Sequence, residues 1–361
     1  MNFDFSEEQL LLRETVSRWA AERHGLDTAR RRAQRRQPGG FDREGWRELG
    51  ALGLLALPFA ADMGGLGGGP ADLVAVAEPL GAALAIEPFT EALVMAGSLI
   101  EAGGDRATLA RVIAGEAVPA AALGERGGRY NLHHVETRAR AEGAGWRLSG
   151  AKSAVWQGGA ADLFLVSARV AGDARERAGL GLFLVEAAAV ERRPWVAADG
   201  SLAAELAFHD APATFLECDA EDALDLALDR TWLAAAAEML GIAQMLFDQT
   251  LAYVKTRVQF GQPIGRFQAI QHRMVDCYAR LEQARSMVYR AAARGDTAAI
   301  AAARAFVAEA SIAIAHEAVQ FHGGMGVTDE LVIGHGLKRI QMLARLHGDS
   351  DVAAGRYAAA A

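Results

Sequence analysis

The stretch TRVQFGQPIGRFQAIQ, Thr256 to Gln271, joins two long runs of helical periodicity in the last third of the 361-residue chain. Arg257 carries a fork of N–H donors that suits a phosphate, and Phe260 has a flat face that suits a ring. Gly261 and Gly265 permit a close approach to the backbone. Each of these residues also fits an ordinary turn. The stretch is therefore a helix–loop–helix junction and a candidate binding loop.

A second loop of this kind, EAVQFHGGMGVTDE from Glu317 to Glu330, follows the next long helical run. Its paired glycines, Gly323 and Gly324, stand where a helix ends, and glycine is the favoured residue there. A helix end alone explains them, so each loop taken singly favours a structural role. The two loops together are more specific than either.

The rest of the chain changes character twice. Ser6 and Gln9 form a capping box ahead of a helical run, and the first ~115 residues have helical patterns. From Val118 to Phe215, short apolar runs bounded by glycine predict strands of an antiparallel sheet or barrel. Long alanine- and leucine-rich runs then predict a helical bundle. We therefore expect a helical domain over residues 1–116, a β domain over 117–219 and a helical bundle over 220–361.

Composition limits the class of function. The formal charge of -8, with basic residues scattered, gives no footprint for nucleic acid. The exception is an arginine-rich stretch, for which we expect a solvated helix end or loop without a function; its members are Arg30, Arg31, Arg32, Arg35 and Arg36. Cys218 and Cys277 lack the spacing of a metal or redox site, and we expect no metal.

The same reasoning bears on location. The opening MNFDFSEEQLLL is acidic where a secretory signal is basic, and we expect no apolar run long enough to span a bilayer. A soluble protein of a reducing cytoplasm is therefore predicted.

The two loops also carry a resemblance. RVQFGQPIGRFQAIQHRMVD, Arg257 to Asp276, and AVQFHGGMGV, Ala318 to Val327, resemble the signature stretches of the acyl-CoA dehydrogenase family. The resemblance extends over essentially the whole chain and implies an α+β multidomain fold with a helical N-terminal domain, a central antiparallel β domain and a C-terminal four-helix bundle. It also implies FAD bound at a subunit interface. Family members remove the α proton of an acyl-CoA thioester with a carboxylate, while the flavin takes the β hydride.

The resemblance assigns cofactor-binding residues one by one. The family's phosphate-binding arginine falls on Arg257 and its ring-contacting phenylalanine on Phe260. The remaining matches, in the two stretches that reach the FAD of a neighbouring subunit, are Gln268, Gln320, Gly323 and Gly324. All six positions keep the family's residue.

The β domain departs from the family at the flavin ring. The stretch Thr-Glu-Pro-x-Ala-Gly-Ser-Asp falls on Gly124 to Asn131, so both of its hydroxyls are missing, although Tyr130 offers another. The family's second stretch, Lys-x-Trp-x-Thr/Ser-Asn-Gly, falls on Lys152 to Gly158. Ala154 stands where the family has the indole, and Trp156 stands where it has the hydroxyl. A polar ring left without partners loses about 1 to 3 kcal/mol for each group. The chain's own flavin ring site is therefore expected to be weakened.

The catalytic carboxylate is missing as well. Counted without gaps, the family's glutamate position holds His347, and the position in the first bundle helix where other members carry their base holds Thr231. Three interpretations remain open. His347 or Asp349 is the base of a self-sufficient homo-oligomer. Alternatively, the chain is the small subunit of a heteromeric enzyme of the pimeloyl-CoA dehydrogenase type, whose larger acyl-CoA dehydrogenase subunit supplies the glutamate. In the third, the chain is a flavin oxidase or monooxygenase that uses O2, or it has no catalytic activity.

The resemblance implies the molecular partners too. They are an acyl-CoA substrate, an electron-transfer flavoprotein as acceptor and, in the second interpretation, a larger subunit in a heterotetramer; the first would give a homotetramer. The second interpretation accounts best for the pattern. The bundle keeps the family's cofactor-binding residues, whereas the β domain has lost the family's residues at the flavin ring.

Overall fold

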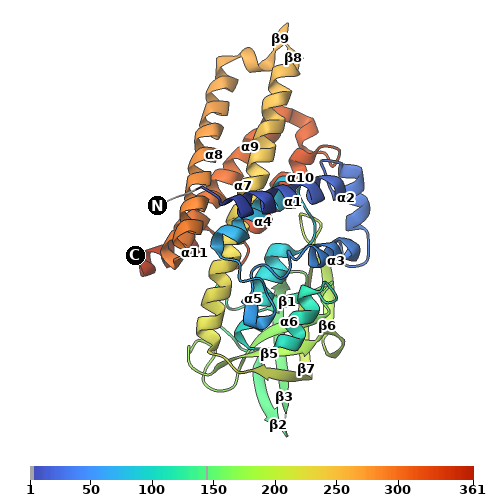
Figure 1. The fold of residues 1–361 in the computed structure, drawn as a ribbon, viewed down its shortest axis with the longest axis vertical. Helices are drawn as coiled ribbons and strands as arrows, with labels where there is room; N and C mark the ends of the chain where they lie inside the picture. The colour runs from blue at the N-terminus through green and yellow to red at the C-terminus, as the bar shows by residue number, and fades with distance from the viewer. Residues whose placement is uncertain (1–3, 144) are drawn as a thin grey trace. The chain divides into compact units, whose positions relative to one another are not determined.

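The computed structural model describes residues 4–143 and 145–361 (Figure 1). The first three residues of the acidic opening lie outside it. The helices are α1 Glu7–Arg23, α2 Thr28–Arg35, α3 Arg43–Ala51, α4 Pro70–Ala82, α5 Met95–Ala102, α6 Arg106–Ile113, α7 Ala220–Thr256, α8 Gln268–Arg294, α9 Thr297–His322, α10 Val332–Leu343 and α11 Ser350–Ala360. The strands are β1 Pro119–Ala122, β2 Arg138–Glu142, β3 Gly145–Val155, β4 Leu163–Arg169, β5 Leu180–Glu186, β6 Glu191–Val196, β7 Leu202–Leu216, β8 Val258–Gln259 and β9 Gln262–Pro263. The predicted order of helices, strands and helices is confirmed.

The chain divides into two compact units that do not follow the sequence order. One comprises residues 1–33, 70–85 and 232–361, and the other comprises residues 34–69 and 86–231. The domain boundaries expected after residues 116 and 219 stay a prediction. The first unit is called the bundle unit below and the second the barrel unit.

The bundle unit is built from α8, α9 and the part of α7 from Trp232 onward, and these long helices match the predicted runs. Its α4 and α7 cross where both carry glycine. A Cβ on Gly81 would lie 2.1 Å from the Glu238 carbonyl oxygen, and one on Gly241 would lie 2.0 Å from that of Glu78. Only glycine permits two helix backbones to approach this closely.

A buried carboxylate joins four helices of the same unit. Glu78 of α4 accepts hydrogen bonds from Arg13 of α1 at 2.8 Å and from Arg285 and Tyr289 of α8 at 3.3 and 3.2 Å. Arg285 also donates to Gln244 of α7 at 2.6 Å. The charge of Glu78 is thus compensated inside the bundle unit.

The arginine-rich stretch lies in and just after α2, and the expectation of a solvated segment is wrong for Arg31. Its side chain is buried and donates to the Leu84 carbonyl oxygen. Arg32 donates to the carbonyl oxygen of Asp329, and Thr28 donates to that of Glu330 at 3.0 Å. These side chains supply donors to backbone carbonyl oxygens of other segments of the bundle unit.

One helical segment contradicts the expectation about apolar runs. Thr297–Val327, which contains α9, is long and apolar enough to cross a membrane. Buried residues make up 61% of its apolar window, because α9 packs against α8, α10 and α11. The core of a helical bundle meets the same criteria of length and composition as a membrane span.

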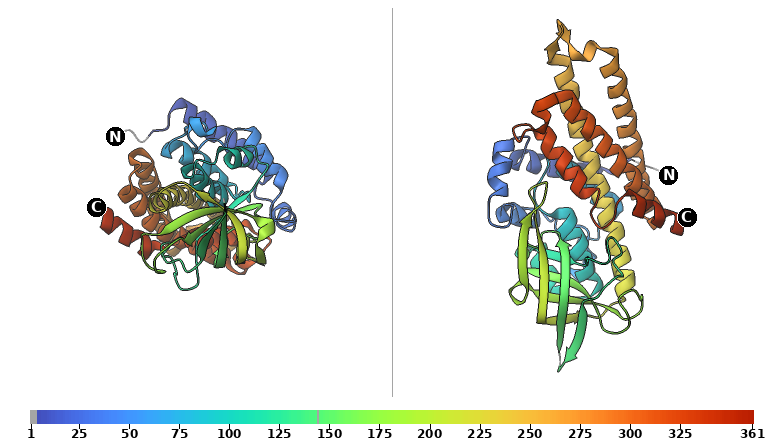
Figure 2. Two further views of the ribbon diagram at one scale, coloured as in Figure 1. Left: turned by 90° about the horizontal axis from the view of Figure 1, so that it is seen from below. Right: turned by 180° about the vertical axis from the view of Figure 1, so that it is seen from behind.

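The barrel unit closes a sheet in the order β4, β2, β3, β7, β5 and back to β4. Neighbouring strands run antiparallel except where β4 meets β1 and β2, which it pairs in parallel. The predicted antiparallel barrel is therefore confirmed with these two parallel pairings added. Apolar side chains such as Phe164, Phe183 and Phe208 fill its interior, and the strands curve around this core in Figure 2.

Candidate cofactor site

The two signature loops meet at one end of the bundle unit. There the end of α7, Ile264 just after the β8–β9 hairpin, the start of α8 and the end of α9 share an apolar cluster around Val254, Met274 and Phe321. Tyr253 of α7 stacks on His322 of α9 with ring centroids 4.2 Å apart. The Arg273 guanidinium lies 4.7 Å from the Phe321 ring centroid. Residues more than 50 positions apart in the sequence are thereby held as one surface, called the bundle end below.

The six residues assigned to the cofactor by resemblance all lie at the bundle end, and all are exposed. Phe260 stands at the tip of the β8–β9 hairpin with 90% of its surface exposed and a φ of 53°. A bare phenyl ring costs free energy in water, and a non-glycine residue in the left-handed region carries strain. Both features indicate a binding surface.

The glycines of the bundle end leave the backbone open. A Cβ built on Gly323 or Gly324 would meet no atom within 4 Å, and Gly323 has a φ of 59°. Arg257 and Gln320 add donors at the same bundle end, and together these residues fit the phosphate-bearing half of FAD. The bundle end passes this test of fit.

The second pair of stretches meets in the barrel unit, as the resemblance requires. The Ser153 N–H donates to the Gly124 carbonyl oxygen at 2.9 Å, which brings the two stretches side by side. Together with β6 and β7 they surround a cleft of about 610 Å³, called the barrel cleft below; its lining residues are Glu125, Arg126, Gly127, Glu136, Thr137, Gly150, Ala151, Lys152, Ser153, Glu191, Arg193, Glu205, Leu206, Ala207 and His209.

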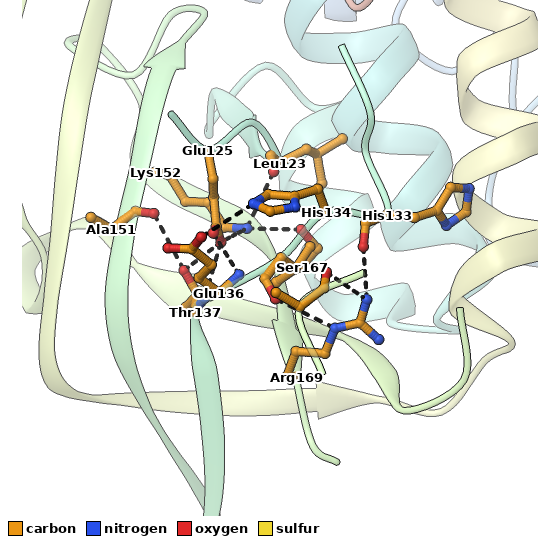
Figure 3. Close-up of polar contacts among 12 residues, drawn as sticks. Leu123, Glu125, His133, His134, Glu136, Thr137, Ala151, Lys152, Ser167 and Arg169 are labelled. Atoms are coloured by element: carbon orange, nitrogen blue, oxygen red, sulfur yellow. Dashed lines mark hydrogen bonds and ion pairs between the residues drawn. The ribbon is translucent and has the colours of Figure 1, made fainter. Parts of the chain in front are cut away.

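A buried ion pair forms the base of the barrel cleft (Figure 3). Lys152 Nζ donates to Glu125 Oε1 at 2.8 Å, to Ser167 Oγ at 3.0 Å and to the Leu123 carbonyl oxygen at 3.2 Å. Thr137 donates to the same Glu125 oxygen through its N–H and its hydroxyl, at 3.1 and 2.7 Å. Every proton of the ammonium thus has an acceptor.

The environment of this pair shifts both pKa values. Burial lowers the pKa of Lys152 to about 8, against the opposing attraction of Glu125. Burial would raise the pKa of Glu125, but the Lys152 charge and the donated hydrogen bonds outweigh it and hold that pKa below its usual value. The pair is therefore a structural element that depends on both partners.

A second buried cation supports the same wall of the barrel. The Arg169 guanidinium is fully buried and drawn with its neighbours in Figure 3. It donates to the carbonyl oxygens of His133, Val135, Ala174 and Ala178. It fixes the loops that precede β2 and follow β4.

Where the family places flavin-flanking side chains, this chain has an ion pair of its own. The Ala154 N–H donates to Glu205 Oε1 at 3.1 Å, and Glu205 Oε2 lies 3.8 Å from Arg126. The sequence analysis missed Glu205, because nothing in the spacing signals that a residue of β7 reaches the end of β3. Tyr130 stands at the place of the family's serine and Trp156 at that of its second hydroxyl residue, and both are half-buried, while Gly124 leaves the threonine hydroxyl unreplaced. The barrel cleft therefore does not fit a flavin ring in the way the bundle end fits the phosphates.

Gln157, next to Trp156, was not singled out by the sequence analysis either. Its side chain is 1% exposed, neither amide atom has a hydrogen-bond partner, and its φ is 57°. Buried unpaired amides of this kind are rare in native proteins.

His347, which stands at the position of the family's catalytic carboxylate, lies in a turn of the bundle unit. His347 is half-buried with a φ of 54°, and buried Arg304 donates to the carbonyl oxygens of Leu343 and Gly348 at 2.5 and 3.1 Å. Asp349 caps α11, accepting from the Val352 N–H at 3.0 Å. Its carboxylate thus already has a structural task.

The alternative base position, Thr231 of α7, is fully buried. Its hydroxyl donates to the Ala227 carbonyl oxygen at 2.6 Å, and it lies 3.2 Å from Met95 Sδ. A hydroxyl bonded within its own helix cannot abstract a proton at neutral pH. Among the residues that the structure describes, no group of three or more His, Cys, Asp or Glu side chains is arranged to hold a metal ion.

Comparison with known proteins addresses the family directly. Models of the N-terminal, middle and C-terminal domains of acyl-CoA dehydrogenases match residues 6–118, 120–211 and 223–361. The acyl-CoA dehydrogenase IpdE2 of Mycolicibacterium smegmatis is 33% identical over 95% of each chain. This chain belongs to the acyl-CoA dehydrogenase family.

Solved structures agree with this assignment. The Tcur3481–Tcur3483 steroid ACAD matches with a TM-score of 0.86 and 30% identity over 98% of this chain and 97% of the other. The ChsE4–ChsE5 complex of Mycobacterium tuberculosis matches with a TM-score of 0.86 and 26% identity over 99% and 98%. Acyl-CoA dehydrogenases are oxidoreductases that act on CH–CH groups, and their cofactor is FAD.

Proposed function

We propose that this acyl-CoA dehydrogenase is one subunit of a heteromeric enzyme and that it binds the phosphate-bearing half of an FAD whose ring rests on a partner chain. The observation that carries the proposal is the contrast between an exposed, fully retained bundle end and a barrel cleft that has lost its ring-binding hydroxyls. FAD, when bound, supplies the acceptor for the electrons of α,β-dehydrogenation. This chain supplies donors and an aromatic face.

Each bundle-end residue has a task under this proposal. Arg257 gives a charge-assisted contact to a phosphate, and Phe260 covers a ring. Gln268 and Gln320 donate or accept at polar atoms of the dinucleotide, while the bare backbone at Gly323 and Gly324 admits it closely.

The catalytic glutamate then belongs to the partner. His347 replaces it here, Thr231 is bonded within α7, and Asp349 caps a helix. Two of the similar structures are named as pairs of unlike chains, which agrees with a larger subunit as the partner in a heterotetramer.

The proposed substrate is an acyl-CoA thioester and the proposed acceptor an electron-transfer flavoprotein, in the cytoplasm. The likeness to a steroid ACAD makes an acyl-CoA with a fused-ring body the first substrate class to assay.

Flavin content tests the proposal. The chain purified alone should carry little FAD, and the complex with its larger subunit should carry it tightly. In that complex Arg257→Ala should weaken FAD retention by about 10- to 100-fold, the loss expected for a charged hydrogen bond. Arg266→Ala is the matched control, since Arg266 is an exposed arginine of the same loop outside the assigned set.

Two results would contradict the proposal. One is full flavin absorbance of the lone chain with bleaching on addition of acyl-CoA. The other is activity of the complex that is lost with His347→Ala but survives loss of the partner's glutamate, which would restore the self-sufficient interpretation. Peroxide or a hydroxylated product formed under air without an acceptor protein would instead favour O2-using chemistry.

A further inference from the structure

The ion pairs of the barrel cleft have no part in the proposed function. The cleft is as large as a ligand site, yet the carboxylates at its rim are paired within the chain. Glu205 lies 3.8 Å from Arg126, and Glu191 lies 3.3 Å from Arg193 and 3.1 Å from His209. The chain itself therefore occupies the polar groups that a ligand would use.

Glu205 holds the decisive position among these groups. Its carboxylate accepts the N–H of Ala154, whose side chain replaces the family's flavin-flanking indole and whose φ of 50° is strained for a non-glycine residue. A flavin ring laid against this stretch would have to displace Glu205 or cover it. Displacement leaves the Ala154 N–H without its acceptor, and covering removes water from a charged carboxylate.

Arg126 makes displacement harder. It stands where the family has proline, and its guanidinium faces Glu205 across the mouth of the barrel cleft. One oxygen of the Glu205 carboxylate thus accepts from the backbone of β3, and the other lies within ion-pair distance of this exposed arginine, which adds a weaker attraction. Neither contact involves the buried pair of Lys152 and Glu125 beneath.

We infer that Glu205, held by Arg126 and the Ala154 N–H, closes this chain's own barrel cleft to a flavin ring. This inference rests on the proposed function. It adds that the side chains of Glu205 and Arg126 exclude a flavin ring from the barrel cleft, beyond the loss of the hydroxyls that would bind the ring. It makes Glu205 a specificity-determining residue that directs FAD to the partner's ring site.

Riboflavin, which has the ring without the phosphates, tests the inference on the isolated chain by quenching of flavin fluorescence. Wild type should show no saturable binding. Glu205→Ala should bind riboflavin at least about tenfold more tightly, the change that corresponds to about 1.4 kcal/mol. Combining it with Gly124→Thr, which restores the family's hydroxyl, should strengthen binding further.

Two variants serve as controls. Glu136→Gln changes another carboxylate of the barrel cleft, one paired with His134 at 3.2 Å and not with Ala154, and should leave riboflavin unbound. Glu205→Gln keeps an acceptor for the Ala154 N–H without the charge, and should bind riboflavin more weakly than Glu205→Ala does. Circular dichroism melting verifies that each variant is folded, and Glu205→Ser replaces the alanine variant if that one is not.

Saturable binding of riboflavin by the wild type at the level of Glu205→Ala would overturn the inference. So would failure of both the alanine and the serine variants to bind when Gly124→Thr is present. The proposed function has its own test, because FAD retention by the complex is measured separately with Arg257→Ala.

Discussion

The bundle end and the barrel cleft hold the two sets of positions that the resemblance assigns to the cofactor, but they differ in where their polar groups are directed. At the bundle end Arg257, Gln320 and Phe260 point into solvent, and the glycine backbone is uncovered. In the barrel cleft Glu205 and Lys152 are directed at other groups of the same chain. Exposed polar side chains are solvated and stay available to a ligand, whereas buried polar groups are hydrogen-bonded within the chain. The comparison separates a candidate binding surface from a structural one.

The largest effect is expected at the buried pair of the barrel unit. Glu125→Gln removes the charge that compensates Lys152 and should lower the free energy of unfolding by about 3 to 5 kcal/mol, the cost of leaving one partner of a buried ion pair. Urea denaturation followed by circular dichroism measures it. Glu136→Gln, at an exposed carboxylate close by, should change little. An effect of Glu125→Gln no larger than that of its control would mean that the pair is not structural.

The same pair gives a dependence on pH. The pKa of Glu125 is lower in the folded state than its usual value, so its contribution to stability is complete above that usual value and is lost as the pH falls through the folded pKa. Unfolding measured from neutral to acidic pH should therefore show a shallower loss of stability in Glu125→Gln than in wild type. Parallel curves for the two proteins would contradict this origin of the acid sensitivity.

A smaller effect of opposite sign is expected at Gln157. Replacing its unpaired buried amide by the apolar side chain of similar length in Gln157→Met should raise the free energy of unfolding by about 1 kcal/mol. The melting temperature under identical conditions measures the gain. Destabilisation by this substitution would show that the amide has a partner in solution, such as an ordered water.

At the bundle end a matched pair of glycines separates backbone strain from ligand contact. Gly323→Ala should cost about 1 kcal/mol of stability, because alanine is disfavoured at a φ of 59°, while Gly324→Ala should cost almost nothing. Both should reduce retention of FAD by the complex if a ligand approaches this backbone. Unchanged FAD retention in both variants would remove the glycines from the cofactor site.

The smallest effect on stability is expected at Phe260. Its side chain is almost entirely exposed, so Phe260→Ala should change the free energy of unfolding by less than about 0.5 kcal/mol. FAD retention by the complex should nevertheless fall. A loss of stability with unchanged FAD retention would reverse the assignment of the bundle end as a binding surface.

Much of the fold could be predicted because its signals are local. The capping box of Ser6 and Gln9 begins α1 as expected, and the long apolar runs form α7, α8 and α9. The glycine-bounded runs form the strands of the barrel. The expectation that no helix could pass for a membrane span failed, because packing around α9 and not its own composition determines its environment.

The site could be predicted only in part. The family was recognised from two short loops, and the structure brings those loops together, but the cofactor roles of Arg257 and its neighbours stay predictions. Contacts between distant positions left no mark on the sequence. Glu205 and Ala154 are separated by 51 residues, and Glu125 and Lys152 by 27, so neither spacing reveals an interaction.

The turn that carries His347 has a consequence for how this chain could change over evolutionary time. Arg304 donates to backbone carbonyl oxygens of the turn, and a carbonyl is present whatever residue occupies the position. These backbone contacts do not depend on the side chain at position 347, so a substitution there can add or remove a carboxylate while the contacts to Arg304 are kept. The φ of 54° at this position favours residues that tolerate left-handed backbone.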